Sequence, residues 1–481
     1  MRERVVIVGG GIGGVAAATL LAEQGVAVTL LEKGKSLGGR AGGWTDLLRD
    51  GTLFEMERGT VRFCRFDRNA RALLRRVDPA LASLAPLDDY PLLGPDTAIG
   101  SITKLRAADL LRRASAGRVR DLIKSDLRRA SLLLSFDPED TYRRLDATPA
   151  RTFLNELRFP PAASAVIQGL VGHATFDAFD RYSAAEMVSL FQYCLGADAA
   201  GLELDVLRGP ASARLWQPLA DYLSERGARV ATRCEVLAVE RTNGLVVRYR
   251  SRGVLQTAGA DAMILAADIP SIRKLVAASP DLAVAAPGLR SLEISLPMVT
   301  WRVWLDRPVR PERAPFAVTT GLGMLDAIAV HDRLSVPGSR WERERGRCVV
   351  ELHAYAVAES AGDAAIRGNL MAQLHTLYPE TRTARIVEER FLKKRDSPAF
   401  LPGTQASRPG VLTADPRIFL AGDFVKLPFP ASPIERAASA GFLAANSILA
   451  GWGKRTEPLA HGHVRGALAS LRRAKQDLFG L

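Results

Sequence analysis

Cysteine and aromatic residues are scarce in this sequence, and each scarcity argues against a class of function. The 481 residues include only four cysteines, Cys64, Cys194, Cys234 and Cys348, and no two of them have C-x-x-C spacing. This scatter argues against a zinc or iron–sulfur site and for a reducing cytoplasm. The six histidines form no metal-binding pattern, and the aromatic residues, at 6%, rarely interleave with the basic ones. We therefore expect no metal centre and no nucleic-acid partner.

Long apolar runs and low-complexity linkers are also missing. No run approaches the roughly 20 apolar residues of a membrane-spanning helix. The opening Met1-Arg2-Glu3-Arg4 leads directly into an apolar strand pattern, without a signal peptide. Hydrophobic residues make up 47% of the chain, which suffices for a large core, and the length predicts two or three structural units. We expect a globular, cytoplasmic protein.

Positive charge, by contrast, is in excess, because the formal net charge is +13. Part of it lies in two basic amphipathic stretches of helix-forming composition, residues 104–134 and 463–481. Such helices can lie on an anionic membrane, or they can be solvated faces of an arginine-rich protein. Both interpretations stay open, and with them peripheral membrane contact; the oligomeric state stays open too. His461 and His463 have no carboxylate or cysteine partner beside them, and we expect them to be solvated.

The start of the chain predicts a strand, a helix and a second strand. Val5–Val8 is a short β-branched run, Val15–Gln24 is rich in alanine and leucine, and Val26–Leu31 is a second apolar run. Glycines fill the connection between the first strand and the helix. This order is that of a right-handed βαβ unit with two buried, parallel strands.

Gly9, Gly11 and Gly14 in that connection have the spacing G-x-G-x-x-G. The first permits a tight turn, the second lets the backbone approach a pyrophosphate, and the third lets helix and strand pack closely. The free N–H groups of the helix N-terminus would face the phosphates. Glu32 follows the second strand, where an acid can accept hydrogen bonds from an adenosine ribose. Together these features predict a dinucleotide site.

The tail Gly38-Gly39-Arg40 distinguishes between the possible dinucleotides. Simple nicotinamide dehydrogenases rarely continue in this way, whereas many FAD enzymes do. Glycine lets the chain pass close to the pyrophosphate, and the arginine supplies charge-assisted hydrogen bonds. Gly39 and Arg40 therefore indicate FAD, with an ordinary surface arginine as the alternative. No second G-x-G-x-x-G is present for a nicotinamide cofactor.

The segment "FLAGD" predicts a further cofactor contact at the end of a buried strand. Residues 417–425 have the apolar pattern of that strand, and Gly422 and Asp423 follow its apolar core. The glycine would let the backbone approach the cofactor. The Asp423 carboxylate can bind the ribityl hydroxyls of FAD.

The helix predicted for residues 432–452 begins near Ile434, just after "FLAGD". Its N-terminal amides carry positive partial charge, and near the pyrimidine end of a flavin they would stabilise the anion formed when flavin accepts hydride. Lys426 offers a competing source of the same field. Ser432 and Glu435 also fit a capping box, so a purely structural role for these two residues is an alternative.

The remaining segments predict an α/β fold with an α+β second domain. Residues 104–225 have mainly helical patterns, Asn243-Gly244 marks a hairpin, and residues 260–268 form another buried strand. Residues 290–357 alternate apolar and polar positions, as in an antiparallel sheet. We therefore predict a two-domain flavoprotein with a discontinuous Rossmann-type FAD-binding domain and a substrate domain of helices plus antiparallel sheet. The predicted FAD-binding domain comprises residues 1–100, 210–275 and 405–460, the substrate domain comprises 101–209 and 276–404, and a basic helix covers 461–481.

Several of these motifs resemble the carotenoid-desaturase and amine-oxidase superfamily. The opening "GGGIGGVAAATLLAEQG" and "LLEKGKSLGGRAGGW" carry the general resemblance. The segments "VVELHAYAV", "LHTLYPETRTARIVEERFL" and "LAGDFVKLPFPASPIERAASAGFLAAN" resemble the isorenieratene-synthase type of carotenoid desaturase/methyltransferase, which aromatises β-rings. So do "NARALLRRVDPAL" and "PLDDYPLL", and the resemblance covers most of the chain. It implies FAD, with flavin contacts at Gly9, Gly11, Gly14, Glu32, Gly39, Arg40, Gly422, Asp423 and Ile434, and a backbone contact of Val236 with adenine.

The substrate side departs from that family. After Arg58-Gly59 the family has a run rich in histidine and aromatic residues, whereas this chain reads "TVRFCRFDRN". Three functions therefore stay open. The first is a desaturase or isomerase of a carotenoid or similar polyene. The second is an enzyme that oxidises or cyclises another lipophilic metabolite, such as a polyketide, and the third is a protein that uses FAD without net redox chemistry.

In the first two functions, hydride passes from an activated C–H bond to flavin N5. Arg58 and His173 are the candidate catalytic residues that would face the flavin. For His173 a buried structural role is the alternative, and His353 is expected in the core or on the surface of a sheet. No serine–histidine–aspartate triad and no activated cysteine is recognisable.

Overall fold

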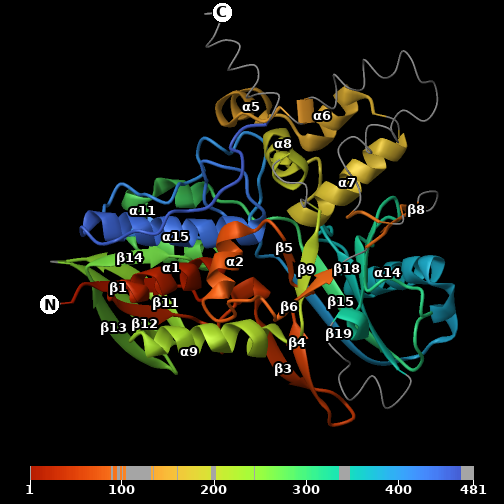
Figure 1. Ribbon diagram of the computed structural model, residues 1–481, viewed down its shortest axis with the longest axis horizontal. Coiled ribbons are helices and arrows are strands. Elements are labelled where there is room, and N and C mark those ends of the chain that lie inside the picture. Colours follow the sequence, from red (N-terminus) through yellow and green to blue (C-terminus); the bar gives the residue numbers. More distant parts are fainter. Residues whose placement is uncertain are drawn as a thin grey trace, which may run out of the picture.

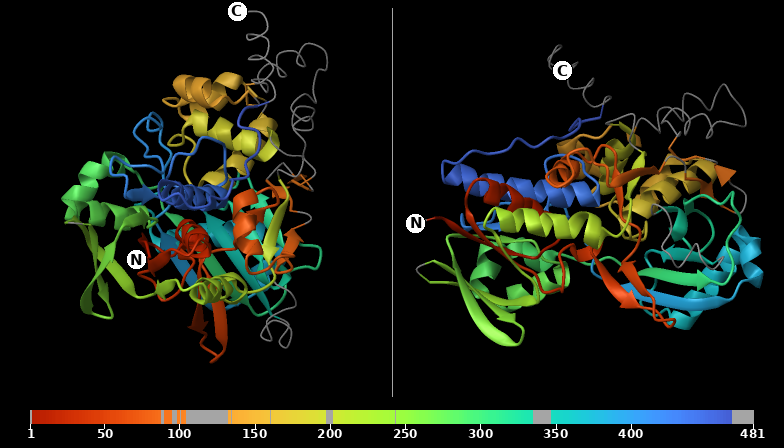
Figure 2. Two further views of the ribbon diagram at one scale, coloured as in Figure 1. Left: turned by 60° about the vertical axis from the view of Figure 1, so that its left-hand side comes forward. Right: turned by 60° about the horizontal axis from the view of Figure 1, so that its bottom comes forward.

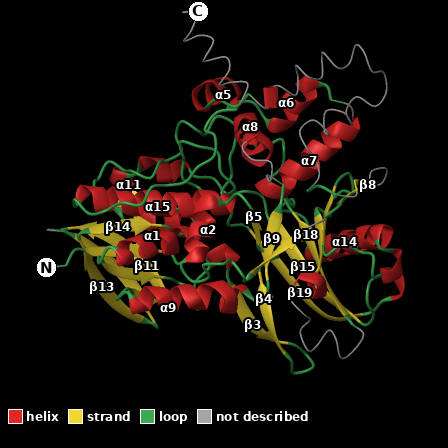
Figure 3. Cartoon of the chain, viewed as in Figure 1, coloured by secondary structure: helices red, strands yellow, loops and turns green. Residues whose placement is uncertain are grey.

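Two large sheets lie side by side in the molecule, and a group of helices lies above the second of them in the view of Figure 1. Figure 3 shows these helices in red above the yellow strands. The computed structural model describes residues 2–87, 90–94, 98–99, 101–103, 132–133, 135–159, 161–196, 202–242, 244–334 and 347–466.

The first sheet is parallel throughout, with the strand order β10-β2-β1-β14-β20. Its core strands are apolar and buried, as expected of a parallel sheet that is covered on both faces. Its strands come from three distant stretches of the chain, which is the topology of a discontinuous nucleotide-binding fold. The strands are β1 (Arg4–Val8), β2 (Ala27–Leu31), β10 (Arg229–Ala231), β14 (Ala262–Leu265) and β20 (Ile418–Leu420).

Two helices, α1 (Ile12–Glu23) and α15 (Pro433–Gly451), pack closely against each other beside this sheet. Both views of Figure 2 show α1 in red next to α15 in blue. The contact depends on glycine, because a Cβ at Gly441 would lie 2.2 Å from the carbonyl oxygen of Gly13. The first helix begins three residues before its predicted start, so the glycine turn is shorter than the sequence indicated.

A three-stranded antiparallel sheet directly precedes β14 in the chain and contacts strands β1 and β2 of the first sheet. It comprises β11 (Cys234–Arg241), β12 (Leu245–Ser251) and β13 (Val254–Ala260). The predicted hairpin between β11 and β12 is confirmed. The third strand was not predicted, although the connecting residues Arg252 and Gly253, both with positive φ, form the tight turn that leads into it. Three helices flank this part: α9 (Gln217–Glu225), α10 (Ile269–Ala278) and α11 (Pro280–Ala285).

The second large sheet has seven strands in the order β19-β15-β18-β17-β16-β7-β8 and is antiparallel except between β16 and β7. The antiparallel sheet predicted within residues 290–357 is confirmed, with edge strands added from elsewhere in the chain. Helix α14 (Asp363–Leu377) packs on it through its apolar side chains. The strands are β7 (Leu92–Leu93), β8 (Ala98–Ile99), β15 (Met298–Leu305), β16 (Phe316–Thr319), β17 (Ala327–Val330), β18 (Cys348–Ala354) and β19 (Ile386–Lys394).

Several smaller groups of helices and strands surround the two large sheets. The helical group contains α5 (Pro138–Leu145), α6 (Ala150–Leu157), α7 (Pro161–Thr175) and α8 (Ala184–Phe191), which continues as the π-turn η2 (Gln192–Gly196). Helix α2 (Arg68–Arg75) packs on α15, and the hairpin of β3 (Gly43–Leu47) and β4 (Leu53–Glu57) covers the second sheet. A small sheet holds β5 (Arg62–Cys64), β6 (Leu84–Leu87) and β9 (Leu204–Leu207).

Strand β9 lies in the stretch that the sequence predicts as mainly helical, so that prediction is wrong for residues 204–207. The strand forms because it pairs with β5 and β6, whose residues are more than 100 positions earlier. Residues 104–131 and 467–481 lie outside the described residues. Within the described part, no helix combines the length and apolar character that crossing a bilayer requires.

Candidate cofactor-binding site

Three motif glycines form the turn between β1 and α1, and one of them has open space where a Cβ would be. A Cβ at Gly9, whose φ is +108°, would lie 2.5 Å from the carbonyl oxygen of Ala266. A Cβ at Gly14 would lie 1.9 Å from the carbonyl oxygen of Gly9. At Gly11, the N-cap of α1, a Cβ would meet nothing within 4 Å. The fold itself therefore requires Gly9 and Gly14, whereas Gly11 leaves room for a phosphate at the helix N-terminus.

Glu32, directly after β2, holds this turn in place. Its buried carboxylate accepts a hydrogen bond of 2.7 Å from the N–H of Gly10 and one of 2.6 Å from the N–H of Gly34. A carboxylate has about four acceptor positions, so two remain for further donors such as ribose hydroxyls. The start of β11, the strand that contains Val236, lies beside Glu32, because the N–H of Cys234 donates to the carbonyl of Glu32.

Arg40 and Asp423 join the two predicted cofactor segments. Gly39 lies against the glycine turn, because its Cβ would be 3.4 Å from the Cα of Gly11. The next residue, Arg40, forms an ion pair with Asp423, and its second nitrogen lies 3.4 Å from the hydroxyl of Ser397. The structure therefore brings Gly11, Gly39, Arg40 and Asp423 into one cluster. Gly422 precedes Asp423 with a φ of +130°, a conformation that favours glycine.

The charge of Arg40 is maintained by several carboxylates. Burial opposes this charge, but Asp423, then Asp396 and Asp268, hold the pKa of Arg40 above its ordinary value. Asp396 is also the ion-pair partner of Arg58. The predicted catalytic residue Arg58 thus belongs to the same chain of charges as the predicted phosphate-binding arginine. A permanent cation at this place suits an anionic ligand.

The N-terminus of α15 has one amide free for a ligand. The hydroxyl of Ser432 accepts a hydrogen bond of 3.2 Å from the N–H of Glu435, and Pro433 has no N–H. Among the described residues, the N–H of Ile434 has no hydrogen-bond partner. Only half of the predicted capping box forms, because the Glu435 carboxylate turns to α2 instead of back to Ser432.

His173 and Lys426 are the remaining candidates from the sequence. His173 lies in α7, and its side chain is outside the described part of the structure. Lys426 is exposed, and its Nζ lies 3.5 Å from the carbonyl oxygen of Gln405. His461 and His463 are exposed, as expected, and the ring of His461 stacks on Phe429.

A buried ionic cluster behind the Arg58-Gly59 segment was not predicted. Glu351 on β18 accepts hydrogen bonds of 2.9 Å and 3.0 Å from the N–H and hydroxyl of Thr60. The other oxygen of Glu351 pairs with Arg302 on β15, and His353 Nε2 lies 2.8 Å from the oxygen that accepts from Thr60. Burial opposes the ionisation of Glu351, but Arg302 outweighs it and holds the pKa of Glu351 well below its ordinary value.

Gly59 fits tightly against this cluster, because its Cβ would lie 3.0 Å from the ring of His353. The cluster thereby fixes the path of the chain from Arg58 to Thr60. The signal in the sequence was weak: one acid and one base in strands that otherwise read as apolar. Their pairing follows from the register of β15 and β18, which places Arg302 opposite Glu351.

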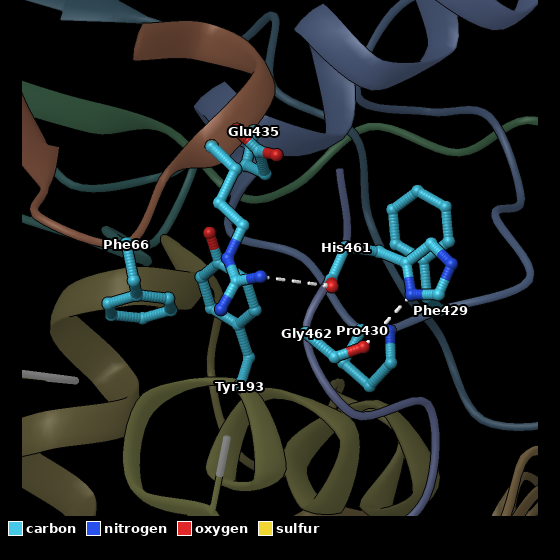
Figure 4. A pocket seen from close by; sticks show the side chains of 8 residues that line it. Phe66, Tyr193, Phe429, Pro430, Glu435, His461 and Gly462 are labelled. Atoms are coloured by element: carbon cyan, nitrogen blue, oxygen red, sulfur yellow. Dashed lines mark hydrogen bonds between the residues drawn. The ribbon is translucent and has the colours of Figure 1, made fainter. Parts of the chain in front are cut away.

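A small pocket opens where α2, α15, η2 and the C-terminal segment 453–466 meet (Figure 4). The rings of Phe66 and Tyr193 lie on one side of it, and those of Phe429 and His461 lie on the other. It is lined by Phe66, Arg68, Tyr193, Phe429, Pro430, Glu435, His461 and Gly462.

The described residues include groups that suit a dinucleotide, and they include no cluster that could hold a metal ion. The open side of Gly11, the free amide of Ile434 and the cation of Arg40 fit an elongated anionic cofactor such as FAD. No group of three or more histidine, cysteine, aspartate or glutamate side chains in the described part could hold a metal ion. The four cysteines are free thiols.

Comparison with known proteins gives four informative similarities. A family model described as "Flavin containing amine oxidoreductase" matches residues 12–449. A carotenoid phi-ring synthase from Streptomyces griseus is 40% identical over 98% of this chain and 92% of its own. A Synechococcus elongatus protein named "Probable zeta-carotene desaturase" is 25% identical over 93% of this chain and 98% of its own. Among solved structures, putrescine oxidase bound to putrescine has the same fold, with a TM-score of 0.65 at 16% identity over 94% of this chain and 99% of that one.

Proposed function

The chain belongs to the family of flavin-containing amine oxidoreductases and is an FAD-dependent oxidoreductase, and from this premise we propose that it desaturates the end ring of a carotenoid. The observation that carries the proposal is the 40% identity to a phi-ring synthase over nearly the whole of both chains. The isorenieratene-type motifs of the C-terminal half support the same substrate class. FAD, when bound, supplies the hydride acceptor.

The proposal gives each part of the site a task. Gly11, Gly39 and Arg40 hold the pyrophosphate, Glu32 binds the adenosine ribose, and the backbone of Val236 borders the adenine. Asp423 holds the ribityl chain, with Gly422 giving it space, and Ile434 presents its free N–H to the flavin. We propose the same division of the chain as before, with residues 1–100, 210–275 and 405–460 forming the cofactor domain. The parallel sheet, whose strands come from all three stretches, supports this division.

The product determines how many hydrogen atoms the reaction removes. Each new double bond in the ring requires the loss of one hydride to the cofactor and one proton to a base or to water. Aromatising a β-ring requires this twice, so four hydrogen atoms leave each ring. One of the two methyl groups on its quaternary carbon must also migrate to the neighbouring carbon, because a carbon with four single bonds cannot be part of an aromatic ring. The cation of Arg58, held by Asp396, stands at the side where the resemblance places the substrate.

A second candidate is the oxidation of another lipophilic metabolite that carries a polar group. It is favoured by the segment after Gly59, where basic residues replace the aromatic run of the carotenoid enzymes. In this segment the guanidinium of Arg62 lies 4.4 Å from the ring centre of Phe316, and Arg65 pairs with Glu203 and Asp205. A polar substrate group would suit such surroundings better than a pure hydrocarbon.

Expression in a bacterial host that accumulates a β-ring carotenoid tests the proposal. We expect a new pigment whose mass is lower by four hydrogens for each converted ring. Gly11→Val in the same host serves as the control that cannot bind FAD. If the holoprotein is yellow but the pigment is unchanged, the carotenoid assignment is wrong and the second candidate takes its place.

We further propose that the enzyme meets its substrate at the surface of an anionic membrane. The basic stretches 104–134 and 463–481 support this proposal. Lipophilic substrates concentrate in bilayers, and basic amphipathic helices bind to anionic bilayers. Most of both stretches lies outside the described residues.

A further inference from the structure

The N-termini of α2 and α15 meet, and carboxylates tie each to the other. Glu435, in the first turn of α15, accepts hydrogen bonds of 2.9 Å from the N–H groups of both Asn69 and Ala70 in α2. Asp67, the N-cap of α2, accepts a hydrogen bond of 2.9 Å from the hydroxyl of Ser432, the N-cap of α15. The cap of each helix therefore depends on an acidic residue of the other.

This arrangement follows from helix electrostatics. Two helix N-termini carry positive partial charge, so bringing them together requires negative groups between them. Both carboxylates are nearly inaccessible, with exposed fractions of 1% for Asp67 and 3% for Glu435. Neither forms an ion pair with any lysine, arginine or histidine among the described residues. Their donors are neutral groups, including the hydroxyl of Tyr193, 2.5 Å from Asp67.

Charged and titratable groups surround the pair from each packed element. Arg71 attracts Asp67, but it is already paired with Asp205. Arg68 donates to the carbonyl of His461 and not to either carboxylate of the pair. The surrounding groups are Arg62 and Cys64 of β5, Arg68 and Arg71 of α2, Tyr193 and Cys194 of η2, Asp205 of β9, and His461 of the C-terminal segment.

Burial and mutual repulsion make the loss of both protons from this pair unfavourable. Burial raises the pKa of Asp67 to about 6. Burial, and then the charge of Asp67, raise the pKa of Glu435 to about 7. Two neighbouring carboxylates in such surroundings titrate as a pair near neutral pH, because ionising both places two like charges close together in the interior.

We propose that Asp67 and Glu435 form a proton-holding pair that takes up a proton when the flavin is reduced. The pair is adjacent to Ile434, whose free N–H is the proposed contact with the flavin, so the inference rests on the proposed function at that point. Hydride transfer leaves a negative charge on the reduced flavin, and this charge raises the proton affinity of the pair. The hydride comes from the reductant and the proton from water, and Glu435 lines the pocket in Figure 4.

Both acids act as positioning residues. They hold the N-terminus of α15, and their protonation changes the electrostatic potential that this terminus presents. Linkage makes the effect reciprocal: if reduction favours protonation, protonation raises the reduction potential to the same extent. The pair would thus match the charge of the helix terminus to the redox state of the cofactor.

Proton uptake on reduction tests the inference without any substrate. The holoprotein is photoreduced in weak buffer at pH 7 with an indicator dye, and the protons consumed per flavin are measured. We expect Glu435→Gln and Asp67→Asn to consume fewer protons than the wild type, by up to one per flavin. The reduction potential of both variants should also fall less steeply between pH 6 and 8.

Glu186→Gln is the matched control. Glu186 is also buried and touches the first turn of α15 through Arg436, but its pKa is lowered to about 2, so it stays ionised at pH 7. Under conditions in which circular dichroism shows this variant to be folded, the replacement should leave proton uptake unchanged. Equal uptake in the wild type, Glu435→Gln and Asp67→Asn would overturn the inference.

Infrared difference spectra of the wild type provide a test that needs no variant. Reduction of the wild type should convert a carboxylate signal into a carboxylic acid signal. If neither signal changes on reduction, the pair does not respond to the flavin. Because substrate is absent throughout, these results are independent of whether the substrate is a carotenoid.

Discussion

Arg40 and Asp423 form an ion pair of 2.5 Å although 383 positions separate them in the chain. One belongs to the glycine-rich tail after β2, and the other follows β20. The sequence predicts two independent cofactor contacts in these segments, and the structure joins them in a single unit. A group that binds Arg40 therefore also fixes the position of Asp423.

Asp423→Ala should weaken FAD binding and lower turnover at saturating flavin. The variant removes the proposed ribityl contact and leaves the Arg40 guanidinium without its closest partner. A hydrogen bond to a charged group contributes about 1.5–3 kcal/mol, so we expect the Kd for FAD to rise roughly 10- to 150-fold. Titration of the apoprotein by flavin fluorescence measures the change.

Lys426 provides the comparison for this prediction. Its side chain is exposed and directed to the carbonyl of Gln405, so Lys426→Met should leave the reduction potential of the flavin nearly unchanged. Asp423→Ala should alter it, because the ring loses its fixed position against α15. A marked fall in potential for Lys426→Met, with no change for Asp423→Ala, would show that the lysine and not the helix N-terminus supplies the field.

From the buried ion pairs of Glu186, we expect the folded protein to lose stability in acid. Glu186 accepts hydrogen bonds from Arg408 and Arg436, and thereby ties α8 to α15. Burial opposes its charge, but Arg436 and Arg408 outweigh burial and lower the pKa of Glu186 to about 2. Since the pKa is lower in the folded state, the stabilisation is complete above the unfolded value of about 4.3 and is lost as the pH falls toward 2.

Glu186→Gln should therefore reduce the free energy of unfolding by about 3–5 kcal/mol at pH 7, because two buried arginines lose their partner. It should also remove part of the decline in stability between pH 5 and 2. Denaturant melts at several pH values measure both effects. Asp140→Asn is the control, because its pairs with Arg143 and Arg144 are exposed and should contribute less than about 1 kcal/mol. Equal losses in the two variants would refute the assignment.

Local patterns in the sequence predicted the parts of the fold that depend on neighbouring residues. The βαβ unit, the hairpin after β11 and the helix α15 each have periodic apolar positions and turn residues within one window. The strand β9 does not, because it exists through pairing with β5 and β6. The strand β13 was missed for a different reason: it pairs with the adjacent β12, but its residues are mostly exposed and show no apolar pattern.

In the candidate site, too, residues in local motifs were predictable, and residues whose role depends on distant partners were not. Gly11, Gly39, Arg40 and Asp423 were recognisable because each belongs to a short motif with a chemical purpose. Glu351 was not, because its role arises from a partner across the sheet and from the loop at Thr60. Glu435 was recognised as half of a capping box, but its actual partners lie in α2, which no local pattern could indicate.

The basic stretches predict weak binding to anionic membranes. Residues 104–134 and 463–481 should favour vesicles with anionic lipids over neutral ones, and salt should weaken the binding, because exposed charges are screened. Co-sedimentation with both kinds of vesicle at low and high salt measures this. Equal and negligible binding to both would identify the stretches as ordinary solvated faces.

Two glycines of one turn should respond in opposite ways to substitution. Gly14 packs against the backbone, and a Cβ there would lie 1.9 Å from the carbonyl oxygen of Gly9. Gly14→Ala should therefore impair folding itself. At Gly11 a Cβ meets no described atom within 4 Å, so Gly11→Val should fold but should block the approach of the pyrophosphate to the N-terminus of α1.

Gly11→Val should accordingly be soluble and colourless, with a thermal melt close to that of wild-type apoprotein and no gain in stability when FAD is added. Wild-type apoprotein should gain stability with FAD concentration, because the ligand binds only the folded state. Gly14→Ala should melt well below both. If Gly11→Val binds FAD as tightly as the wild type, the pyrophosphate does not pass over Gly11, and the site must lie elsewhere along the carboxyl ends of the parallel strands.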